Sequence, residues 1–479
     1  MTQQEMVSAP GTGTQPPRLD QIDAFRELMS RGWGRPDRSA QVDPGWARAT
    51  ADHRRRLAEA LPGQVLVVAA GRAPVRANDT SYDFRPHSAF AWLAATNLEG
   101  SVLVLRPGAG QGGAALYVEP AAAAGSVQAF RDAARGELWV GGAPGTAELA
   151  EALQLEVRPL EQLPEALASA GRFQCVGPLD AGLVPTGGLP PSDELARVLS
   201  ELRGVKDDWE VGELRKAVDA TVAGFAATAA ELGTAVAGGG ERWLQGTFDR
   251  HARTYGNGVG YATIVGSGPH APVLHWVRCD GAVAPEDLVL LDMGVETRTY
   301  YTADVSRTLP AGGTYTPAQR ELYALVERSH RAGIAAVRPG ARFSDFHHAA
   351  MEVLAHGLAD RGLLGVSADE ALSPTGQQHR RWLVCGIGHH LGLDVHDCAD
   401  IPQTDYQDAV LEAGMVLTVE PGLYFHAFDE LAPPEFRGLG IRSEDDLLVT
   451  ADGVENLSAA LPSDVDELQA WTRRQAGRD

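Results

Sequence analysis

The chain has 479 residues, of which 44% are hydrophobic and 22% are charged, a composition typical of globular proteins. Its net charge of −22 argues against nucleic acid and anionic membrane surfaces as partners. A chain of this length exceeds one ordinary hydrophobic core, so two domains are expected.

The first half of the chain reads as an α/β domain over residues 18–188. Residues 1–17 lack the basic start and apolar centre of a signal peptide, and we expect them to form a disordered tail. A helical periodicity begins at Arg18, and a helix-like segment covers 145–153. Short apolar runs predict strands at 64–70, 101–107, 114–120, 137–142 and 155–160.

A Pro- and Gly-rich stretch, "LVPTGGLPPSDE" at 183–194, predicts a linker. Val211, Leu214, Val218, Val222 and Phe225 then recur at the spacing of an amphipathic helix. Helical segments alternate with β-like runs at 288–294, 414–424 and 438–450. Residues 189–479 are therefore expected to form a separate α+β domain.

Four segments of this second domain place an acid or a histidine at the edge of an apolar run. Asp292 and Asp304 lie twelve residues apart, at the end of one β-like run and the start of the next. The stretch "GIGHHLGLDVHD" at 386–397 holds three histidines, and its glycines argue against a helix. Glu420 and Glu444 interrupt two further β-like runs. Spacing alone does not decide which of these histidines acts.

Each acid taken singly is most simply a turn or cap residue. Together they suggest a cation site, because carboxylates cannot share a site of low dielectric without positive charge between them. Four carboxylates and one imidazole form an oxygen-rich ligand set that suits Mn²⁺ best and tolerates Co²⁺ or Zn²⁺. Their four negative charges balance two divalent ions.

The order and spacing of these blocks resemble the aminopeptidase P and prolidase family, relatives of methionine aminopeptidase. The resemblance rests on "LHWV" at 274–277, the aspartate pair, "GHHLGLDVHD", "VLTVEPGLY" and "FRGLGIRSEDD". Residues 78–97, "NDTSYDFRPHSAFAWLAATN", are similar to the aminopeptidase P form of the first domain. The resemblance implies a C-terminal pita-bread catalytic domain and a smaller N-terminal α/β domain.

The resemblance also implies two metal ions and a hydrolase that removes the first residue from peptides with proline second. The implied metal ligands are Asp292, Asp304, His389, Glu420 and Glu444, with Asp304 and Glu444 bridging both ions. His275 and His396 would bind the substrate and stabilise the oxyanion, and Glu420 would move a proton. Arg442 and Tyr424 would lie nearby as substrate-binding residues, with Arg442 also taking a catalytic part. His390 would take no part.

Three features of the sequence depart from the family pattern. The interval between the aspartates is one residue longer than usual, Cys385 stands where histidine is frequent, and Ala89 stands where some relatives have an acid. A longer turn or a bulge would absorb the extra residue.

The alternatives are a prolidase restricted to dipeptides, a creatinase-like hydrolase, and a metal-free binding protein on the same fold. The four cysteines form no C-x-x-C pair, which fits a reducing compartment, and a cytoplasmic location is expected. The expected partners are peptide substrates and further copies of the chain in a dimer or tetramer.

Overall fold

The computed structural model describes residues 18–34, 36–40, 42–107, 113–183, 192–402, 405–406 and 409–478. The chain divides into two units, Met1–Leu199 and Ser200–Asp479. The predicted tail at 1–17 and the central part of the predicted linker, residues 184–191, lie outside the described residues.

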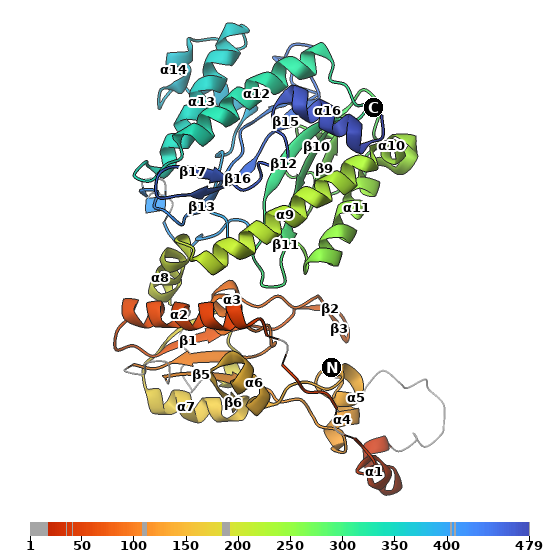
Figure 1. Ribbon diagram of the computed structural model, residues 1–479, viewed down its shortest axis with the longest axis vertical. Helices are drawn as coiled ribbons and strands as arrows, with labels where there is room; N and C mark the ends of the chain where they lie inside the picture. Colours follow the sequence, from red (N-terminus) through yellow and green to blue (C-terminus); the bar gives the residue numbers. More distant parts are fainter. Residues whose placement is uncertain are drawn as a thin grey trace. The chain divides into compact units, whose positions relative to one another are not determined.

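The N-terminal unit is built on a five-stranded mixed sheet with the strand order β6-β5-β4-β1-β7 (Figure 1). β1 pairs antiparallel with β4 and parallel with β7, and β5 pairs antiparallel with β4 and parallel with β6. The strands of the whole N-terminal unit, including the separate pair β2 and β3, are β1 Leu66–Ala69, β2 Val75–Ala77, β3 Thr80–Ser81, β4 Val102–Leu105, β5 Ala114–Val118, β6 Glu156–Pro159 and β7 Gln174–Val176. Its α-helices are α1 Asp23–Met29, α2 Pro44–Ala60, α3 Ser88–Ala94, α4 Val127–Arg131, α5 Glu137–Val140, α6 Thr146–Leu153 and α7 Leu163–Ala170, and α8 Asp193–Gly204 runs into the second unit.

Four of the five predicted strands of this unit are confirmed, as β1, β4, β5 and β6. All residues of β1 and β4 are buried, which explains their continuous apolar sequences. The helix-like segment predicted at 145–153 is confirmed as α6. β7 was not predicted, because Gln174–Val176 is too short to show a periodicity.

The strand predicted at 137–142 is wrong, since Glu137–Val140 forms the short helix α5. Leu138, Trp139 and Val140 favour a strand by residue type, yet they are 42, 59 and 55% exposed. The segment is held instead by the Glu137 carboxylate, which pairs with Arg38 at 2.5 Å and accepts a hydrogen bond from the Ala124 amide at 2.6 Å. Contacts of the Glu137 side chain with Arg38, 99 residues away, and with Ala124 therefore outweigh β-propensity here.

The second unit contains several small antiparallel sheets. β9, β10 and β12 form one sheet in the order β12-β10-β9, and β13, β16 and β17 form another in the order β13-β16-β17. β8 pairs with β11, and β14 pairs with β15. The strands are β8 Gly258–Val259, β9 Ile264–Ser267, β10 Leu288–Met293, β11 Val295–Glu296, β12 Val305–Pro310, β13 Val416–Val419, β14 Gly422–Phe425, β15 Leu439–Arg442, β16 Asp445–Val449 and β17 Val454–Asn456.

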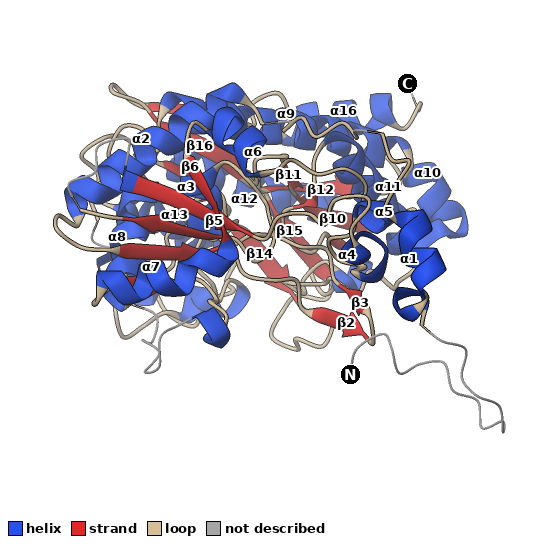
Figure 2. Cartoon of the chain, turned by 90° about the horizontal axis from the view of Figure 1, so that it is seen from below, coloured by secondary structure: helices blue, strands red, loops and turns tan. Residues whose placement is uncertain are grey.

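Helices cover these sheets from outside, with α9 and α11 near β9–β11 and α12 near β13 and β14 (Figures 1 and 2). The helix predicted from Val211 to Phe225 is confirmed as part of α9, and Asp207 and Glu210 close its start in a reciprocal capping box. The helices are α9 Asp208–Ala230, α10 Leu232–Thr234, α11 Gly240–Tyr255, α12 Pro317–Ala336, α13 Phe343–Asp360, α14 Ala368–Leu372 and α16 Val465–Gln475, with a π-helical turn at Ala235–Gly239 and a 3-10 helix η8 at Gln378–Trp382.

A direct bridge between the two halves of this unit positions the acidic residues. Ser306 of β12 and Glu444 pair as an isolated antiparallel bridge, so the β10–β12 sheet meets the turn between β15 and β16. The contact brings chain segments almost 140 residues apart in sequence to one place. A continuous core of buried apolar residues surrounds it.

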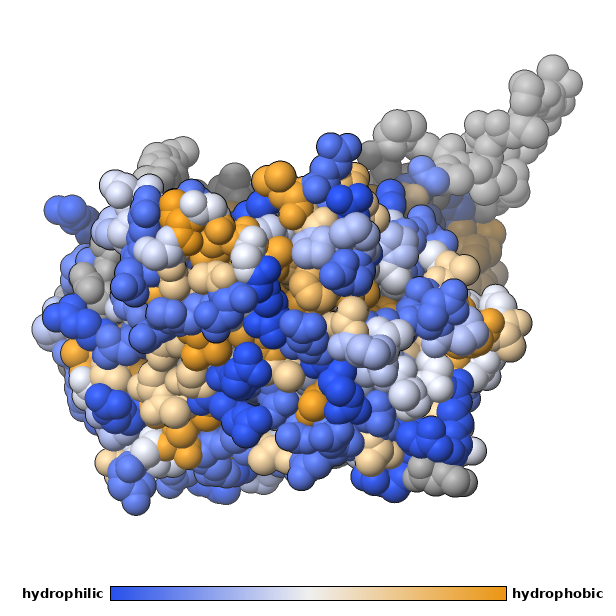
Figure 3. All heavy atoms as spheres, turned by 90° about the horizontal axis from the view of Figure 1, so that it is seen from above, coloured by the Kyte–Doolittle hydropathy of each residue, from blue (hydrophilic) through white to orange (hydrophobic). Residues whose placement is uncertain are grey.

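Among the described residues, no single helix has both the length and the apolar composition needed to cross a membrane, and only the bent pair Asp208–Ala230 and Leu232–Tyr255 meets those criteria together. On the face drawn in Figure 3, hydrophobic side chains form small patches separated by hydrophilic ones.

Candidate active site

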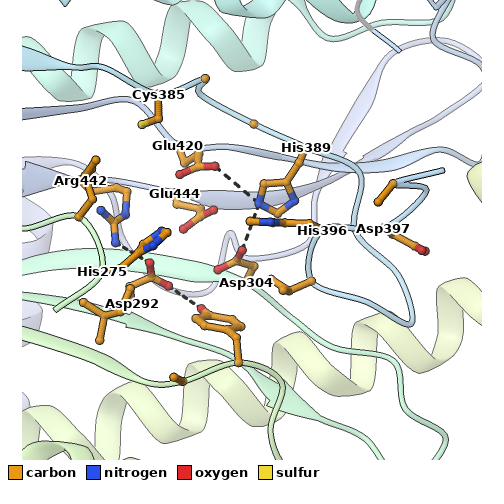
Figure 4. Close-up of a pocket in the computed structure, with 18 of the residues that line it drawn as sticks. His275, Asp292, Asp304, Cys385, His389, His396, Asp397, Glu420, Arg442 and Glu444 are labelled. Carbon is orange, nitrogen blue, oxygen red and sulfur yellow. Dashed lines mark hydrogen bonds and ion pairs between the residues drawn. The ribbon is translucent and has the colours of Figure 1, made fainter. Parts of the chain in front are cut away.

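A cavity of about 850 Å³ opens in the second unit and gathers most of the residues that the sequence singled out (Figure 4). Its remaining wall is largely apolar, with Leu274, Val277, Phe343, Val395 and Ile401 among the lining residues. The predicted site residues that line it are His275, Asp292, Asp304, His389, His396, Glu420, Arg442 and Glu444.

The aspartates meet because β10 and β12 pair as a returning hairpin. Asp292 of β10 stands opposite Ser306, and Asp304 lies directly before β12. The connection between them includes β11 and a turn in which Tyr300 adopts a φ of 75°. Asp292 accepts hydrogen bonds from the Tyr261 hydroxyl and from Arg442 Nη2, both at 2.5 Å.

His389 and Glu420 meet because the segment around His389 runs along β13. The Thr418 amide donates to the His389 carbonyl at 2.9 Å, and the Glu420 amide donates to the Ile387 carbonyl at 2.9 Å. Gly388 permits this approach, since a Cβ there would lie 2.2 Å from the Thr418 carbonyl oxygen. His389 Nε2 consequently lies 3.6 Å from Glu420 Oε1 and 3.3 Å from Asp304 Oδ2.

The tautomer of His389 follows from its second ring nitrogen. Nδ1 lies 3.1 Å from the carbonyl oxygen of His390 and can only donate to it. When the ring is neutral, Nε2 therefore carries the lone pair and faces the carboxylates. This arrangement is the usual one for a histidine that binds a metal ion.

Glu444 supplies the clearest sign that a cation belongs in the cavity. Ser306 Oγ donates to Glu444 Oε2 at 2.7 Å, whereas the buried Oε1 has no hydrogen-bond partner among the described residues. Glu444 is 1% exposed. Asp304, His389 and Glu444 each offer one donor atom, and these atoms lie within 4.8 Å of one another. A buried carboxylate oxygen without a partner is costly, and a metal ion would satisfy it.

The charges of the cluster point the same way. Burial raises the pKa of Glu420 to about 7 and raises the pKa of Glu444 well above its ordinary value, with Asp304 adding to the second shift. Burial alone would lower the pKa of His389, but its contacts with Asp304 and Glu420 outweigh this and raise the pKa to about 9. The carboxylates therefore compete for positive charge, which divalent cations can supply.

The fold separates the other two histidines of the 386–397 stretch, His390 and His396. The His396 ring lies 4.2 Å from the His389 ring, centroid to centroid, at the cavity wall. The His390 ring turns away and packs against Phe343 at 5.2 Å and Tyr406 at 4.9 Å. His390 does not line the cavity.

Tyr424 is placed behind the cavity rather than on its surface. It is 4% exposed, and its hydroxyl accepts a hydrogen bond from Arg442 Nη1 at 3.0 Å. Arg442 is thereby fixed between Tyr424, Ser306 Oγ at 2.8 Å and Asp292.

Sequence reasoning missed Tyr261 and Ser306. Tyr261 lies in a loop with no neighbouring acid, so nothing in its sequence surroundings indicated a contact with Asp292. Ser306 could have been found, because Ser306 and Thr308 of β12 continue an alternation that begins at Asp304, directly before the strand, and hence share a face with it.

Cys385, which stands where the family often has histidine, lines the cavity. Burial is the main cause that raises the pKa of its thiol, and the negative charge of Glu420 adds to the shift. Ala89 is 2% exposed within α3 of the N-terminal unit.

Comparisons with known proteins agree with this geometry. Residues 212–451 match the sequence model of metallopeptidase family M24, and residues 50–174 match that of the aminopeptidase P N-terminal domain. The chain is 46% identical over 454 residues to Xaa-Pro aminopeptidase 2 of Streptomyces coelicolor, an alignment that covers 94% of this chain and 96% of the relative.

Solved structures give the same result. E. coli aminopeptidase P with the inhibitor Pro-Leu superimposes with a TM-score of 0.79 at 26% identity, covering 90% of this chain and 99% of that one. The zinc-substituted E. coli enzyme in complex with product gives a TM-score of 0.77 at 27% identity, covering 90% and 98%. The predicted fold, a pita-bread catalytic domain with a smaller N-terminal domain, is confirmed, and the divalent-metal chemistry of the family fits the residues present. The chain belongs to metallopeptidase family M24, in its Xaa-Pro aminopeptidase branch.

Proposed function

We propose that this chain is a two-metal aminopeptidase that removes the first residue from peptides with proline in second position. The observation that carries the proposal is the convergence of Asp304, His389 and Glu444 at the base of the cavity, with Glu444 Oε1 left without a hydrogen-bond partner among the described residues. The relatives named Xaa-Pro aminopeptidase supply the substrate class.

We divide the five proposed ligand residues between the two ions as the family resemblance implies. Asp292 would hold one ion, His389 and Glu420 the other, and Asp304 and Glu444 both. We propose Mn²⁺ as the preferred metal because four of the five ligands are carboxylates, and Co²⁺ or Zn²⁺ as alternatives. The zinc-substituted E. coli relative supports such tolerance.

Adding Mn²⁺ should raise the melting temperature more at about pH 8.5 than at about pH 6. Without metal, the raised pKa of Glu420 stabilises the fold fully below its ordinary value of 4.5, and this contribution is lost as pH rises through about 7. The contribution of His389 is complete below 6.5 and is lost as pH rises through about 9. Divalent ions replace these protons, so their effect on stability grows with pH.

Differential scanning fluorimetry on metal-free and Mn²⁺-loaded protein measures this difference. The Glu420→Gln variant is the control, because it removes one of the two titrating groups and should shrink the pH dependence. An equal Mn²⁺-induced shift at both pH values in the unmodified protein would contradict the prediction.

The residues around the ligands suit acyl transfer to water. When bound, the two ions supply a hydroxide nucleophile near neutral pH and polarise the carbonyl before proline. Glu420, which lies beside His389 at the edge of the ligand cluster, would pass a proton to the prolyl nitrogen. His275 and His396 would donate hydrogen bonds to the developing oxyanion. Arg442 would hold Asp292 in place through its hydrogen bond.

The substrate proposal extends to peptides longer than two residues. The cavity of about 850 Å³ leaves room beyond a dipeptide, and its apolar wall accepts proline and apolar neighbours. The match of residues 50–174 to the aminopeptidase P N-terminal domain supports the same choice over a prolidase.

Purified protein should release the first amino acid from an Xaa-Pro-Xaa tripeptide faster than it cleaves the dipeptide Gly-Pro, and only with divalent metal. Dialysis against a chelator should abolish both activities, and Mn²⁺ or Co²⁺ should restore the first. Free amino acid is quantified by chromatography after incubation with each substrate.

A tripeptide with alanine in place of proline is the matched control, and it should be cut poorly. Cleavage of dipeptides alone would establish a prolidase instead. Full activity in protein shown by elemental analysis to be metal-free would refute the metal proposal.

Three further expectations accompany the proposal. All four cysteines are free thiols, and Cys175, Cys279 and Cys398 are buried, which supports a cytoplasmic location. A dimer or tetramer stays a prediction, and so does the domain boundary at residue 189.

A further inference from the structure

A second cavity of the C-terminal unit contains an unusual concentration of histidine. It has a volume of about 410 Å³ and shares no lining residue with the active-site cavity. Three of the fourteen histidines of the chain line it, together with one carboxylate. α13 contributes His347, His348 and Glu352, and η8 contributes His379.

The spacing on α13 suits chelation. His348 and Glu352 are four residues apart, so their side chains project from the same face one turn apart. Two metal ligands four residues apart on one helix are a common arrangement in protein metal sites. His347 and Met351 repeat the spacing on the adjoining strip of the helix, and both line the same cavity.

His379 is held in the orientation of a ligand. Its Nδ1 lies 2.9 Å from the Ala371 carbonyl oxygen and donates to it, which leaves Nε2 as the nitrogen able to bind a metal. The residue is only 3% exposed. No hydrogen bond to another described residue occupies the ring of His347 or of His348, so both imidazoles are available.

The protonation states favour a ligand role as well. Burial, and then the neighbouring charges of Arg380 and His348, lower the pKa of His347 to about 4. Burial also lowers the pKa of His379. Both rings are therefore neutral at physiological pH, which metal binding requires.

The positive charge of Arg380 disfavours a cation near His347, but the Arg380 guanidinium is held by hydrogen bonds to backbone carbonyl oxygens. Its guanidinium donates to the carbonyl oxygens of Leu383 at 2.7 Å and of Val384 and Cys385 at 2.8 Å. The donor atoms of the four candidate ligands, all described, do not form a group within 4.8 Å, so binding requires new rotamers of the exposed His348 and Glu352.

We propose that His347, His348, Glu352 and His379 form a separate site for one transition-metal ion of the Zn²⁺ or Ni²⁺ type. Three imidazoles and one carboxylate favour these ions over Mn²⁺, in contrast to the oxygen-rich ligand set of the active site. The two sites therefore differ in metal preference.

Nickel binding to the Mn²⁺-loaded enzyme, prepared without a polyhistidine tag, tests the proposal. Equilibrium dialysis with Ni²⁺ in the presence of excess Mn²⁺ is followed by elemental analysis. The double variant His347→Ala, His348→Ala should lose one bound Ni²⁺ per chain, or bind it more than about tenfold more weakly. His356→Ala is the matched control, because His356 is an exposed histidine of α13 outside this cavity, and it should bind Ni²⁺ like the unmodified protein. Equal Ni²⁺ content in all three proteins would overturn the proposal.

A footprinting measurement on the unmodified chain avoids any loss of folding. Ni²⁺ or Zn²⁺ at micromolar concentration should slow carbethoxylation of His347 and His348, read by peptide mass mapping, and leave His356 unchanged. Equal modification rates with and without metal would reject the site. Xaa-Pro hydrolysis by the double variant is measured in parallel and should persist, so that failure of this inference and failure of the proposed function are told apart.

Discussion

Replacing His389 with alanine should strip metal from the catalytic cavity and nearly abolish peptide hydrolysis. His389 is the only imidazole in the proposed ligand set, and its Nε2 lies within 3.6 Å of both Asp304 and Glu420. Without this ring, the carboxylates of Asp304 and Glu420 still repel each other, but the imidazole that lies between them and reduces the repulsion is gone. Metal content by elemental analysis and kcat on a tripeptide substrate are the measurements.

The neighbouring residue provides the control. His390 is 3% exposed and faces Phe343 and Tyr406 rather than the cavity. His390→Ala should leave the metals and kcat close to normal, while its lost packing destabilises the fold by roughly 1–3 kcal/mol. A metal-free His390→Ala protein beside a metal-replete His389→Ala protein would show that the ligand has been assigned to the wrong member of the pair.

Sequence alone predicted the parts of this site that carry local signals. Asp292, Glu420 and Glu444 were noticed because an acid at the edge of an apolar strand is unusual, and the structure places all three on one cavity. Choosing His389 over His390 required either the family resemblance or the structure, since two adjacent histidines look alike in the sequence. Their separation depends on how 387–391 pairs with β13, a contact between segments almost 30 residues apart.

Contacts at long range were not predictable in the same way. Tyr261 reaches Asp292 across 31 residues and has no local signature. The alternation of Ser306 with Asp304 indicates a shared face, but it does not indicate the contact of Ser306 with Glu444, 138 residues away. The wrong strand prediction at α5 also reflects a contact with a residue far away in the sequence, since Arg38 lies 99 residues from Glu137. The apolar residues of α5 suggested a strand, but a strand needs a paired neighbour, and Glu137 fixes the segment through side-chain contacts instead.

The loop that carries His396 is fixed to its surroundings by its neighbour Asp397. Arg203 pairs with Asp397 and, at 2.8 Å, with Asp394, and Lys206 Nζ lies 3.7 Å from Asp397. The Asp397 amide also donates to the His390 carbonyl at 2.9 Å, which ties the loop to the segment that holds His389. The backbone at His396 is therefore anchored independently of its own imidazole, and removing that imidazole should leave the loop in place.

His396→Ala should consequently retain both metal ions and lose roughly 10²–10³ in kcat, the usual effect of removing one oxyanion donor. The His396 ring lines the cavity beside His389, and it forms no ion pair with the carboxylates of the cluster in the described part of the chain. Its loss therefore leaves the ligand set intact and removes a donor that acts mainly in the transition state, so KM should change less than kcat. Steady-state kinetics on a tripeptide substrate and elemental analysis of the same preparation are the measurements, with His396→Gln as a variant that keeps an N–H donor and should recover part of the rate. Loss of metal from His396→Ala would make His396 a ligand, and an unchanged kcat would remove it from the chemistry.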